Sequence, residues 1–350
     1  MDERLVRDAI EGRKILVTGG TGSFGHQIVK DLMRFNPAFV HIYSRDEKKQ
    51  YEMAMSYKQY ENMRFNIGDV RNLERTRDAM RSIDIVFNAA ALKQVPNCEY
   101  APFEAVETNI IGANNVRRAA IEAGVQIVVS ISTDKAVKPV NVMGMTKAIQ
   151  ERIMLDPTYS DSSTKFICVR YGNVLGSRGS VVPLFYDYIQ KKLPLPITHP
   201  DMTRFQLTLK EAIQLVLWAT VKGESGDLWV QKMPAAGIPD LGQALAYGLK
   251  GKRNYPMTII GMRPGEKMHE VLVSEEEMWR ATELEKYYLI PSWAKSQDKK
   301  TPKKFKVSEY ASNCTHRLTQ EEIYQMLEAD GWFGPDAHAR AIHGVEINEN

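Results

Sequence analysis

A glycine-rich turn between a buried strand and a helix is the feature that most constrains the fold of this chain. The apolar run at 13–18 predicts a strand, and the spacing at 24–35 predicts a helix. Between them lies Gly19-x-x-Gly22-x-x-Gly25. Such glycines permit a tight turn and let the backbone and the helix N-terminus approach a pyrophosphate. The chain therefore begins with a predicted dinucleotide-binding unit.

Strands and helices alternate through the first half of the chain. Strands are predicted at 39–43, 63–67, 83–87, 125–131 and 165–170, and helices at 103–123 and 142–154. This alternation predicts an α/β fold with a Rossmann-like, doubly wound parallel sheet covered on both faces.

The second half of the chain is less regular. Beyond Gly172 the alternation breaks down and prolines mark turns, which indicates a smaller C-terminal substrate-binding region. The helix expected at 209–221 should return to the main sheet. We assign residues 1–178 to the NADP-binding Rossmann domain, with about 206–232 returning to it, and 179–205 and 233–350 to the substrate-binding region.

Composition excludes several classes of protein. The chain has 350 residues, of which 43% are apolar and 25% charged, as in ordinary globular proteins. No apolar run approaches the roughly 18 residues of a membrane span, and a net charge of +3 does not indicate nucleic acid. Three cysteines without metal-ligand spacing indicate reduced thiols. We expect a cytoplasmic protein with no membrane or nucleic-acid partner and no metal site, and a solvated loop at the basic stretch 295–306.

The end of the second predicted strand indicates which dinucleotide binds. An NAD enzyme usually places a carboxylate there, but this chain has Ser44 and Arg45. A guanidinium suits a 2′-phosphate, so NADP is favoured over NAD, although Asp46 could bind a hydroxyl instead. The expected cofactor-binding residues are Gly19, Thr21, Gly22, Ser23, Phe24, Gly25, Ser44, Arg45, Asp46, Lys48, Lys49, Asp69, Val70, Ala89, Ala90, Ala91, Ile131, Ser132 and Lys147.

An acid and a base follow one another at the end of another predicted strand. The run Ser132-Thr133-Asp134-Lys135 lies at the carboxyl edge of the sheet, where ligands of such folds bind. On the next helix, Lys147 follows Met143 by four residues and shares its face. Lys147 should reach the nicotinamide ribose. At another place in the chain, Asp134 and Lys135 would be interpreted as a surface salt bridge. Because they lie beside the expected cofactor, they indicate an acid and a base of a catalytic site.

These motifs resemble the extended short-chain dehydrogenase/reductase family, and more closely its 4,6-dehydratases that act on UDP-N-acetylglucosamine. The resemblance extends from about residue 13 to 326. Besides the glycine turn and the 132–135 run, it rests on Ser44-Arg-Asp-Glu47, Ala91-Leu-Lys-Gln-Val-Pro96, Thr108-Asn109, Arg170-Tyr-Gly-Asn173, Gly176-Ser-Arg-Gly-Ser180, Met202-Thr-Arg-Phe205 and Arg263-Pro-Gly-Glu-Lys267.

The resemblance implies a reaction and roles for these residues. A hydride leaves C4 of the sugar for the cofactor, Lys135 removes the C5 proton, Asp134 protonates the departing C6 hydroxyl, and the hydride returns to C6. Resemblance to the C5-inverting branch implies inversion at C5. It also implies a homo-oligomer, for which a hexamer is our expectation. Burial under the sugar should raise the pKa of Asp134 and lower that of Lys135.

Met143 departs from the family pattern, because many relatives carry tyrosine at this position. A thioether cannot accept a hydroxyl proton. We hypothesise that the Thr133 hydroxyl receives the hydrogen bond of the substrate, and that Lys147, or a water it holds, carries the proton away. Alternatively, Met143 packs in the core of a protein that has lost catalysis.

Further polar residues are expected around the substrate, and more than one function fits the motifs. The resemblance assigns UDP-N-acetylglucosamine to a set comprising Lys93, Asn173, Ser180, Val181, Arg204, Arg263 and Glu266. A UDP-sugar C4 epimerase would use the same hydride chemistry without needing Asp134 and Lys135. A GDP-linked amino-sugar dehydratase and a non-catalytic NADP-sensing protein are also compatible with the sequence.

Overall fold

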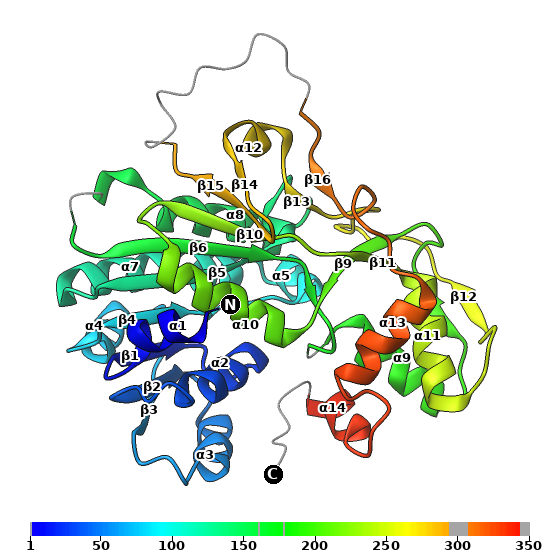
Figure 1. The fold of residues 1–350 in the computed structure, drawn as a ribbon, viewed down its shortest axis with the longest axis horizontal. Helices are drawn as coiled ribbons and strands as arrows, with labels where there is room; N and C mark the ends of the chain where they lie inside the picture. The colour runs from blue at the N-terminus through cyan, green and yellow to red at the C-terminus, as the bar shows by residue number, and fades with distance from the viewer. Residues whose placement is uncertain (1, 160–161, 178, 294–306, 344–350) are drawn as a thin grey trace.

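Nine strands of the described chain form one sheet through the larger part of the molecule (Figure 1). The computed structural model describes residues 2–159, 162–177, 179–293 and 307–343, so the basic stretch 295–306 lies outside it. The order across the sheet is β14-β15-β10-β6-β5-β4-β1-β2-β3. The strands are β1 Lys14–Thr18, β2 Phe39–Ser44, β3 Met63–Ile67, β4 Ile85–Asn88, β5 Ile127–Thr133, β6 Lys165–Tyr171, β10 Asp227–Gln231, β14 Thr282–Glu283 and β15 Tyr287–Pro291.

The strand order confirms the predicted Rossmann-like fold. Strands β3, β2, β1, β4, β5, β6 and β10 are parallel to one another, and the direction of winding reverses between β1 and β4. Ligands of such sheets bind beside this reversal, at the carboxyl ends of the strands. The four residues of β4 are all buried, as expected for a strand covered on both faces.

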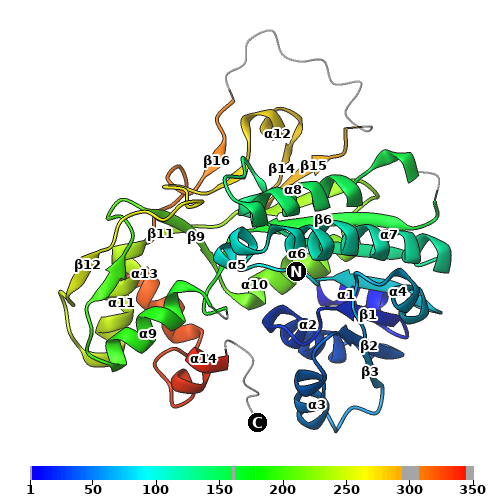
Figure 2. The same cartoon turned by 180° about the vertical axis from the view of Figure 1, so that it is seen from behind.

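Helices cover both faces of the main sheet. The two views show α2 and α10 on one face and α7 and α8 on the other (Figures 1 and 2), and α10 packs against β6 and β10 as predicted for the helix at 209–221. The helices of this part are α1 Glu3–Ile10, α2 Ser23–Met33, α3 Glu47–Ser56, α4 Leu73–Met80, α5 Val95–Tyr100, α6 Pro102–Ala105, η1 Val106–Ile111, α7 Gly112–Ala123, η2 Asp134–Ala136, α8 Val142–Met154, η3 Pro157–Tyr159 and α10 Leu209–Lys222.

A π-helical turn, η1, interrupts the helix predicted at 103–123. Within it, the Asn109 amide accepts a hydrogen bond from the Leu92 N–H at 2.8 Å and donates one to the Leu92 carbonyl at 3.0 Å. It also donates to Thr146 Oγ1 at 2.9 Å. Asn109 therefore holds the loop after β4 against α8, in keeping with the frequent use of π-turns at functional sites.

The rest of the chain forms a smaller region with a second hydrophobic core, beside the carboxyl edge of the main sheet (Figures 1 and 2). Buried residues of α9, α11 and α13 meet in this core. The elements are β7 Asn173–Val174, α9 Val181–Gln190, β8 Leu195–Ile197, β9 Thr203–Leu207, β11 Ala235–Gly237, α11 Ile238–Lys250, β12 Met257–Ile259, β13 Val271–Val273, α12 Glu275–Arg280, β16 Tyr310–Ala311, α13 Gln320–Ala329 and α14 Ala337–His343.

One part of the domain assignment needs correction. The sequence pattern places residues 233–350 in the substrate-binding region, but β14 and β15 extend the main sheet. The reason is backbone pairing: β15 runs antiparallel to β10, from Asp227 opposite Pro291 to Gln231 opposite Tyr287, and β14 pairs with β15.

The sequence predicts neither a membrane span nor a metal site, and the described residues can be examined for both. None of the helices there combines the length and apolar character needed to cross a bilayer. The same part of the chain holds no group of three or more His, Cys, Asp or Glu residues arranged to bind a metal ion.

Candidate active site

The glycine turn forms a cradle that fits a dinucleotide. Gly19 has a φ of +65°, and a Cβ there would lie 2.9 Å from the Ala90 backbone, so the turn packs directly against the loop after β4. A Cβ on Gly25 would lie 2.1 Å from the Gly20 carbonyl oxygen. Gly22 caps α2 without a side-chain hydrogen bond. The helix N-terminus and its positive dipole end are therefore presented to an anion.

The side chains of Ser44 and Asp46, at the end of β2, have internal partners. Ser44 is buried, and its hydroxyl accepts hydrogen bonds from Thr21 Oγ1 at 3.2 Å and Gln50 Nε2 at 3.1 Å. Asp46 caps α3 by accepting from the Lys49 N–H at 3.0 Å. These bonds fix the conformation at the end of the strand, and the Asp46 carboxylate serves as the N-cap of α3.

Arg45, which is exposed, forms an ion pair with the partly buried Asp69, with 3.5 Å between Nη1 and Oδ2. Burial alone would raise the pKa of Asp69, but hydrogen bonds from Arg71 and the charge of Arg45 lower it overall. Val70 is buried in the main core, and Lys48 is largely exposed on α3. Of the Arg45–Asp69 pair, Arg45 is the partner more accessible to a ligand, since its side chain is 48% exposed and that of Asp69 is 23% exposed.

Lys147 lies against the backbone of β5 and is buried. Its ammonium donates to the Ile131 carbonyl at 2.5 Å and to Gln150 Oε1 at 2.7 Å. Desolvation by burial lowers its pKa to about 8, against a weaker opposite effect of Glu151. A lysine with such a pKa is partly neutral near neutral pH and can accept a proton.

A chain of buried hydrogen bonds, unforeseen in the sequence, connects Lys147 to the glycine turn. Gln150 Nε2 donates to Ser130 Oγ at 2.8 Å, and Asn88 Nδ2 donates to the same hydroxyl at 3.2 Å. Thr18 Oγ1 in turn donates to Asn88 Oδ1 at 2.8 Å. The network joins the ends of β1, β4 and β5 to α8, and so fixes Lys147 relative to the cradle.

Asp134 is fully buried at the end of β5. Its Oδ1 accepts from Thr133 Oγ1 at 2.8 Å and from Lys135 Nζ at 3.0 Å, while Oδ2 has no hydrogen-bond partner in the described part. Desolvation raises the pKa of Asp134, Lys135 opposes this effect, and the nearby charge of Glu270 adds to it. The predicted direction for Asp134 is therefore confirmed, and its carboxyl is suited to holding a proton.

The prediction for Lys135 was wrong. Burial acts to lower its pKa, but the charges of Asp134 and Glu270 raise it overall. The Glu270 carboxylate lies 3.6 Å from the Lys135 ammonium, and it reaches this position from just before β13, far along the chain. A residue so distant in sequence, in a stretch with no strand or helix pattern of its own, gives no signal that sequence reasoning could use.

Ser132 does not face the cleft. Its hydroxyl donates to the buried Glu151 of α8. Glu151 also pairs with Arg170, which is 2% exposed and forms two further hydrogen bonds with Glu277 of α12, at 2.9 and 3.0 Å. Ser132 therefore belongs to a buried polar network that connects β5, α8, β6 and α12.

Met143 lies in a small apolar cluster rather than beside polar groups. It is 3% exposed and packs with Cys98 and Ala105, and with partly buried Leu92 and Val95. Its thioether occupies the first turn of α8, whose cap Asn141 accepts from the Gly144 N–H at 2.7 Å.

A cleft of about 810 Å³ opens between the main sheet and the smaller region. It brings together Lys135, Glu270 and most of the predicted substrate-binding residues, namely Asn173, Ser180, Val181, Arg204, Arg263 and Glu266. Lys93 is exposed and is not among the lining residues. Asn173 Oδ1 and Ser180 Oγ are buried and lack hydrogen-bond partners in the described part of the chain. The volume suits a ligand of nucleotide-sugar size.

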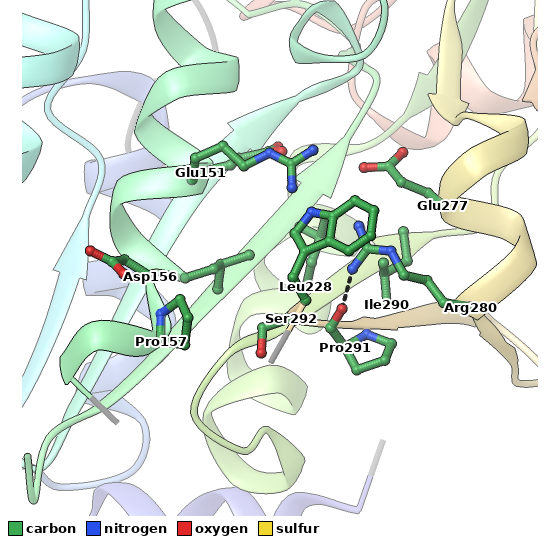
Figure 3. Close-up of a pocket in the computed structure, with 12 residues that line it drawn as sticks. Glu151, Asp156, Pro157, Leu228, Glu277, Arg280, Ile290, Pro291 and Ser292 are labelled. Carbon is green, nitrogen blue, oxygen red and sulfur yellow. Dashed lines mark hydrogen bonds between the residues drawn. The ribbon is translucent and has the colours of Figure 1, made fainter. Parts of the chain in front are cut away.

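A separate cavity of about 170 Å³ lies between α8, α12 and the end of β15 (Figure 3). Its lining includes Glu151, Glu277 and Arg280, and Arg280 donates to the Pro291 carbonyl. It shares no lining residue with the cleft and contains none of the residues predicted to form the site.

Known proteins are similar to this chain over most of its length. The profile of a family described as "Polysaccharide biosynthesis protein" matches residues 15–292. A protein named UDP-glucose 4-epimerase, from Rickettsia bellii, is 44% identical over 332 residues, covering 90% of this chain and 95% of that protein.

Two solved structures are also similar. The X-ray structure of Pen from Bacillus thuringiensis has a TM-score of 0.83 and 36% identity, and covers 91% of this chain and 98% of that one. The dTDP-glucose 4,6-dehydratase DesIV from Streptomyces venezuelae, solved with NAD and TYD bound, has a TM-score of 0.66 at 18% identity, with 73% and 86% covered. The latter likeness concerns the fold alone.

Proposed function

Because the chain belongs to the polysaccharide biosynthesis protein family of short-chain dehydrogenase/reductases, which act on nucleotide sugars, we propose that it is a UDP-N-acetylglucosamine 4,6-dehydratase that inverts C5. The observation that carries this proposal is the Asp134–Lys135 pair at the end of β5, in which Asp134 is buried and Lys135 lines the cleft. Elimination of water needs both an acid and a base, whereas exchange at C4 alone needs neither of these two residues.

Two oxygens in the cleft support binding of a nucleotide sugar. The unpartnered Asn173 Oδ1 can accept a hydrogen bond from a ligand hydroxyl, and the Ser180 hydroxyl can donate one to a phosphate oxygen. Ser180 is the cap of α9, so a diphosphate there would meet a helix N-terminus. The Arg204 guanidinium is oriented by donating to the carbonyls of Thr203 at 2.8 Å and Met268 at 3.2 Å.

A dinucleotide held by the glycine turn would supply the redox chemistry, taking a hydride from C4 of the sugar and returning it at C6. The residues of the chain move the protons. Asp134 gives its proton to the C6 hydroxyl, which leaves as water, while Lys135 takes the C5 proton as the C5–C6 double bond forms. A proton then returns to C5. The sugar loses one water and gains a C4 ketone and a C6 methyl group.

The proton of the 4-hydroxyl needs another acceptor, because Met143 offers none. We assign the hydrogen bond to Thr133 and the proton to Lys147, whose pKa of about 8 makes it available as a base. Thr133→Val should reduce ketone formation at least a hundredfold while cofactor binding persists. Turnover close to that of the unmodified enzyme would remove Thr133 from the mechanism.

NADP is the proposed cofactor. Asp46 caps α3, and Arg45 lies exposed at the end of β2, where a 2′-phosphate would sit. Titration calorimetry should give tighter binding of NADP than of NAD, and Arg45→Ala should remove most of the difference. Equal affinities in the unmodified protein would favour NAD.

A UDP-sugar C4 epimerase is the second candidate, favoured by the name of the 44%-identical relative. Incubation with UDP-N-acetylglucosamine in deuterated water separates the two. A dehydratase gives a product lighter by one water, with deuterium at C5, and the C5 coupling constants report inversion. Unchanged mass with exchange of configuration at C4 would identify an epimerase. The same incubation with UDP-glucose and GDP-linked amino sugars defines the substrate.

A further inference from the structure

Glu270 is a second carboxylate at the Asp134–Lys135 pair, and nothing in the proposed reaction yet uses it. Its side chain is only 4% exposed, yet it lines the cleft together with Lys135. The carboxylate lies 3.6 Å from Lys135 Nζ through Oε1. Buried carboxylates are rare without partners, so the environment of this one identifies its role.

The backbone of Glu270 is held firmly. Its N–H donates to Ser312 Oγ at 3.0 Å, and the Ser312 N–H donates to its carbonyl at 2.8 Å. Ser312 Oγ is also within 2.7 Å of Thr203 Oγ1, on β9. The position of the Glu270 carboxylate is therefore fixed by the packing of β9, β13 and β16 rather than by its contact with Lys135.

Three cations and one acid face this carboxylate. The Lys267 ammonium lies 3.5 Å from Oε2, and Arg204 Nε lies 3.9 Å from Oε1. The charged groups that face Glu270 include Lys135 from η2, Arg204 from β9 and Lys267 from the preceding turn. Asp134 of η2 also interacts with it. Although burial alone would raise the pKa of Glu270, the charges of Lys135, Arg204 and Lys267 lower it overall.

The two carboxylates around Lys135 are therefore unequal. Asp134 is completely buried, and its carboxyl group receives hydrogen bonds only from Thr133 and Lys135 among the described residues. Glu270 has two additional cations. Two carboxylates that share one site do not both ionise readily, and the one with more positive neighbours ionises first.

We propose that Glu270, rather than Asp134, is the ionic partner of Lys135, and that it is a positioning residue for the elimination step. The negative charge of Glu270 stabilises the ammonium that forms as Lys135 takes the C5 proton. An ionised Asp134 is therefore not needed beside Lys135, and Asp134 can keep the proton that it must deliver. That the positioned step is an elimination rests on the proposed function. That Glu270 is the ionic partner of Lys135 does not depend on it.

Removal of the Glu270 charge should move the pH dependence of the whole pair. Without this charge, Asp134 and Lys135 both hold their protons less tightly. The pH range in which they share one proton, the state that reacts, should shift to lower pH by about one unit or more, the usual effect of a charge at such a distance. A residue that served only the fold would lower the rate without moving this range.

The first experiment compares pH–rate profiles for dehydration. Glu270→Gln should move both limbs of the profile to lower pH, and Glu270→Asp should restore them toward their original positions. Glu275→Gln is the matched control: it removes a carboxylate paired with Lys138 at 2.7 Å, outside the cleft, and should leave the profile in place. A Glu270→Gln profile with unchanged midpoints and lower rate would overturn the proposal.

A second variant should shift the pH–rate profile in the opposite direction, and this test does not depend on whether Glu270→Gln folds. Lys267→Met removes a cation that faces Glu270, and Lys267 also interacts with Asp134 and Lys135. Its loss should move the profile to higher pH. Displacement to lower pH would contradict the proposed arrangement of charges.

A third measurement needs no turnover. The side chain of Lys135 is 22% exposed, so its reactivity with acetic anhydride can be followed by mass spectrometry as a function of pH. Glu270→Gln should lower the midpoint by about one unit or more, and Asp134→Asn should change it far less. The reverse ranking would make Asp134 the ionic partner. Absence of dehydration alongside the expected ranking would reject the proposed function and leave the partnership standing.

Discussion

At the scale of single residues, the most direct test concerns the acid and the base. Asp134→Asn and Lys135→Met should each retain dinucleotide binding and lose dehydration by about 10²- to 10⁴-fold, because each removes one proton-transfer group. Calorimetric titration with NADP and single-turnover mass spectrometry measure the two properties. Lys138→Met, which alters an exposed lysine three residues away, is the control. Unimpaired turnover in either variant would refute its assignment.

Lys147 should also leave a signature in stability. Its pKa is lowered to about 8 in the folded protein, so the unfolded chain binds more protons between about pH 8 and 10.5. Stability should therefore rise with pH through this window, by up to about 3 kcal/mol, and this contribution should be missing below pH 8. Urea unfolding of the unmodified protein and of Lys147→Met at pH 7, 8.5 and 10 isolates the effect as their difference. A difference that is constant with pH would contradict the lowered pKa.

Residue-level chemistry was only partly predictable from the sequence. Asp134 and Lys135 could be proposed from the sequence because they follow a strand with a clear pattern, and Lys147 because it lies within a helix with a clear pattern. Glu270 and Gln150 could not, because their importance comes from neighbours brought close by folding. The predicted direction of the pKa shift of Lys135 was wrong for the same reason. The local sequence shows one carboxylate beside Lys135, whereas the folded site has two.

At the scale of elements, Arg170 connects three segments that bear on the site. It pairs with Glu151 on α8 and Glu277 on α12, and its Nη1 donates to the Leu272 carbonyl at 2.8 Å, two residues after Glu270. The pKa of Glu277 falls to about 2, since the charge of Arg170 and its hydrogen bonds outweigh desolvation.

Arg170→Met should be strongly destabilising, by about 3–5 kcal/mol, because it leaves two buried carboxylates without their partner. Denaturant unfolding measures this loss. Lys138→Met, which breaks exposed ion pairs with Glu275 and Glu309, should cost at most about 1 kcal/mol. Equal costs in the two variants would mean that the buried pairs contribute no more than surface ones.

The boundaries of elements were predicted well where periodicity is strong. The helix at 142–154 and the strand at 63–67 have the predicted limits. The π-turn within 103–123 could not be foreseen, since it depends on the tertiary hydrogen bonds of Asn109. The strands β14 and β15 join the sheet only through backbone pairing, β15 with β10 and β14 with β15.

At the scale of the whole molecule, exposed apolar side chains on one face suggest self-association. Met145 and Ile149, one turn apart on α8, are 48% and 46% exposed, and Ile111 on the adjacent η1 is 46% exposed. Exposed apolar groups that cluster on neighbouring helices are typical of subunit contacts.

The expected homo-oligomer can be tested at this face. Light scattering should give a mass above the 39.8 kDa of one chain, and Met145→Glu with Ile149→Glu should lower it. Tyr51→Glu, an exposed site on α3, should leave the mass unchanged. A monomeric unmodified protein would reject the prediction, and a mass of six chains would match the hexamer.

During synthesis, β15 is translated well after β10, the strand with which it pairs. β10 ends at Gln231 and its outer neighbour begins at Tyr287, so about 60 residues must be added before that edge is paired. At ribosomal rates of about 5–20 residues per second, the edge stays open for roughly 3–12 seconds. An unpaired strand edge is a template for association with other chains. The speed of translation between these two strands should therefore influence how much of the protein reaches its native fold.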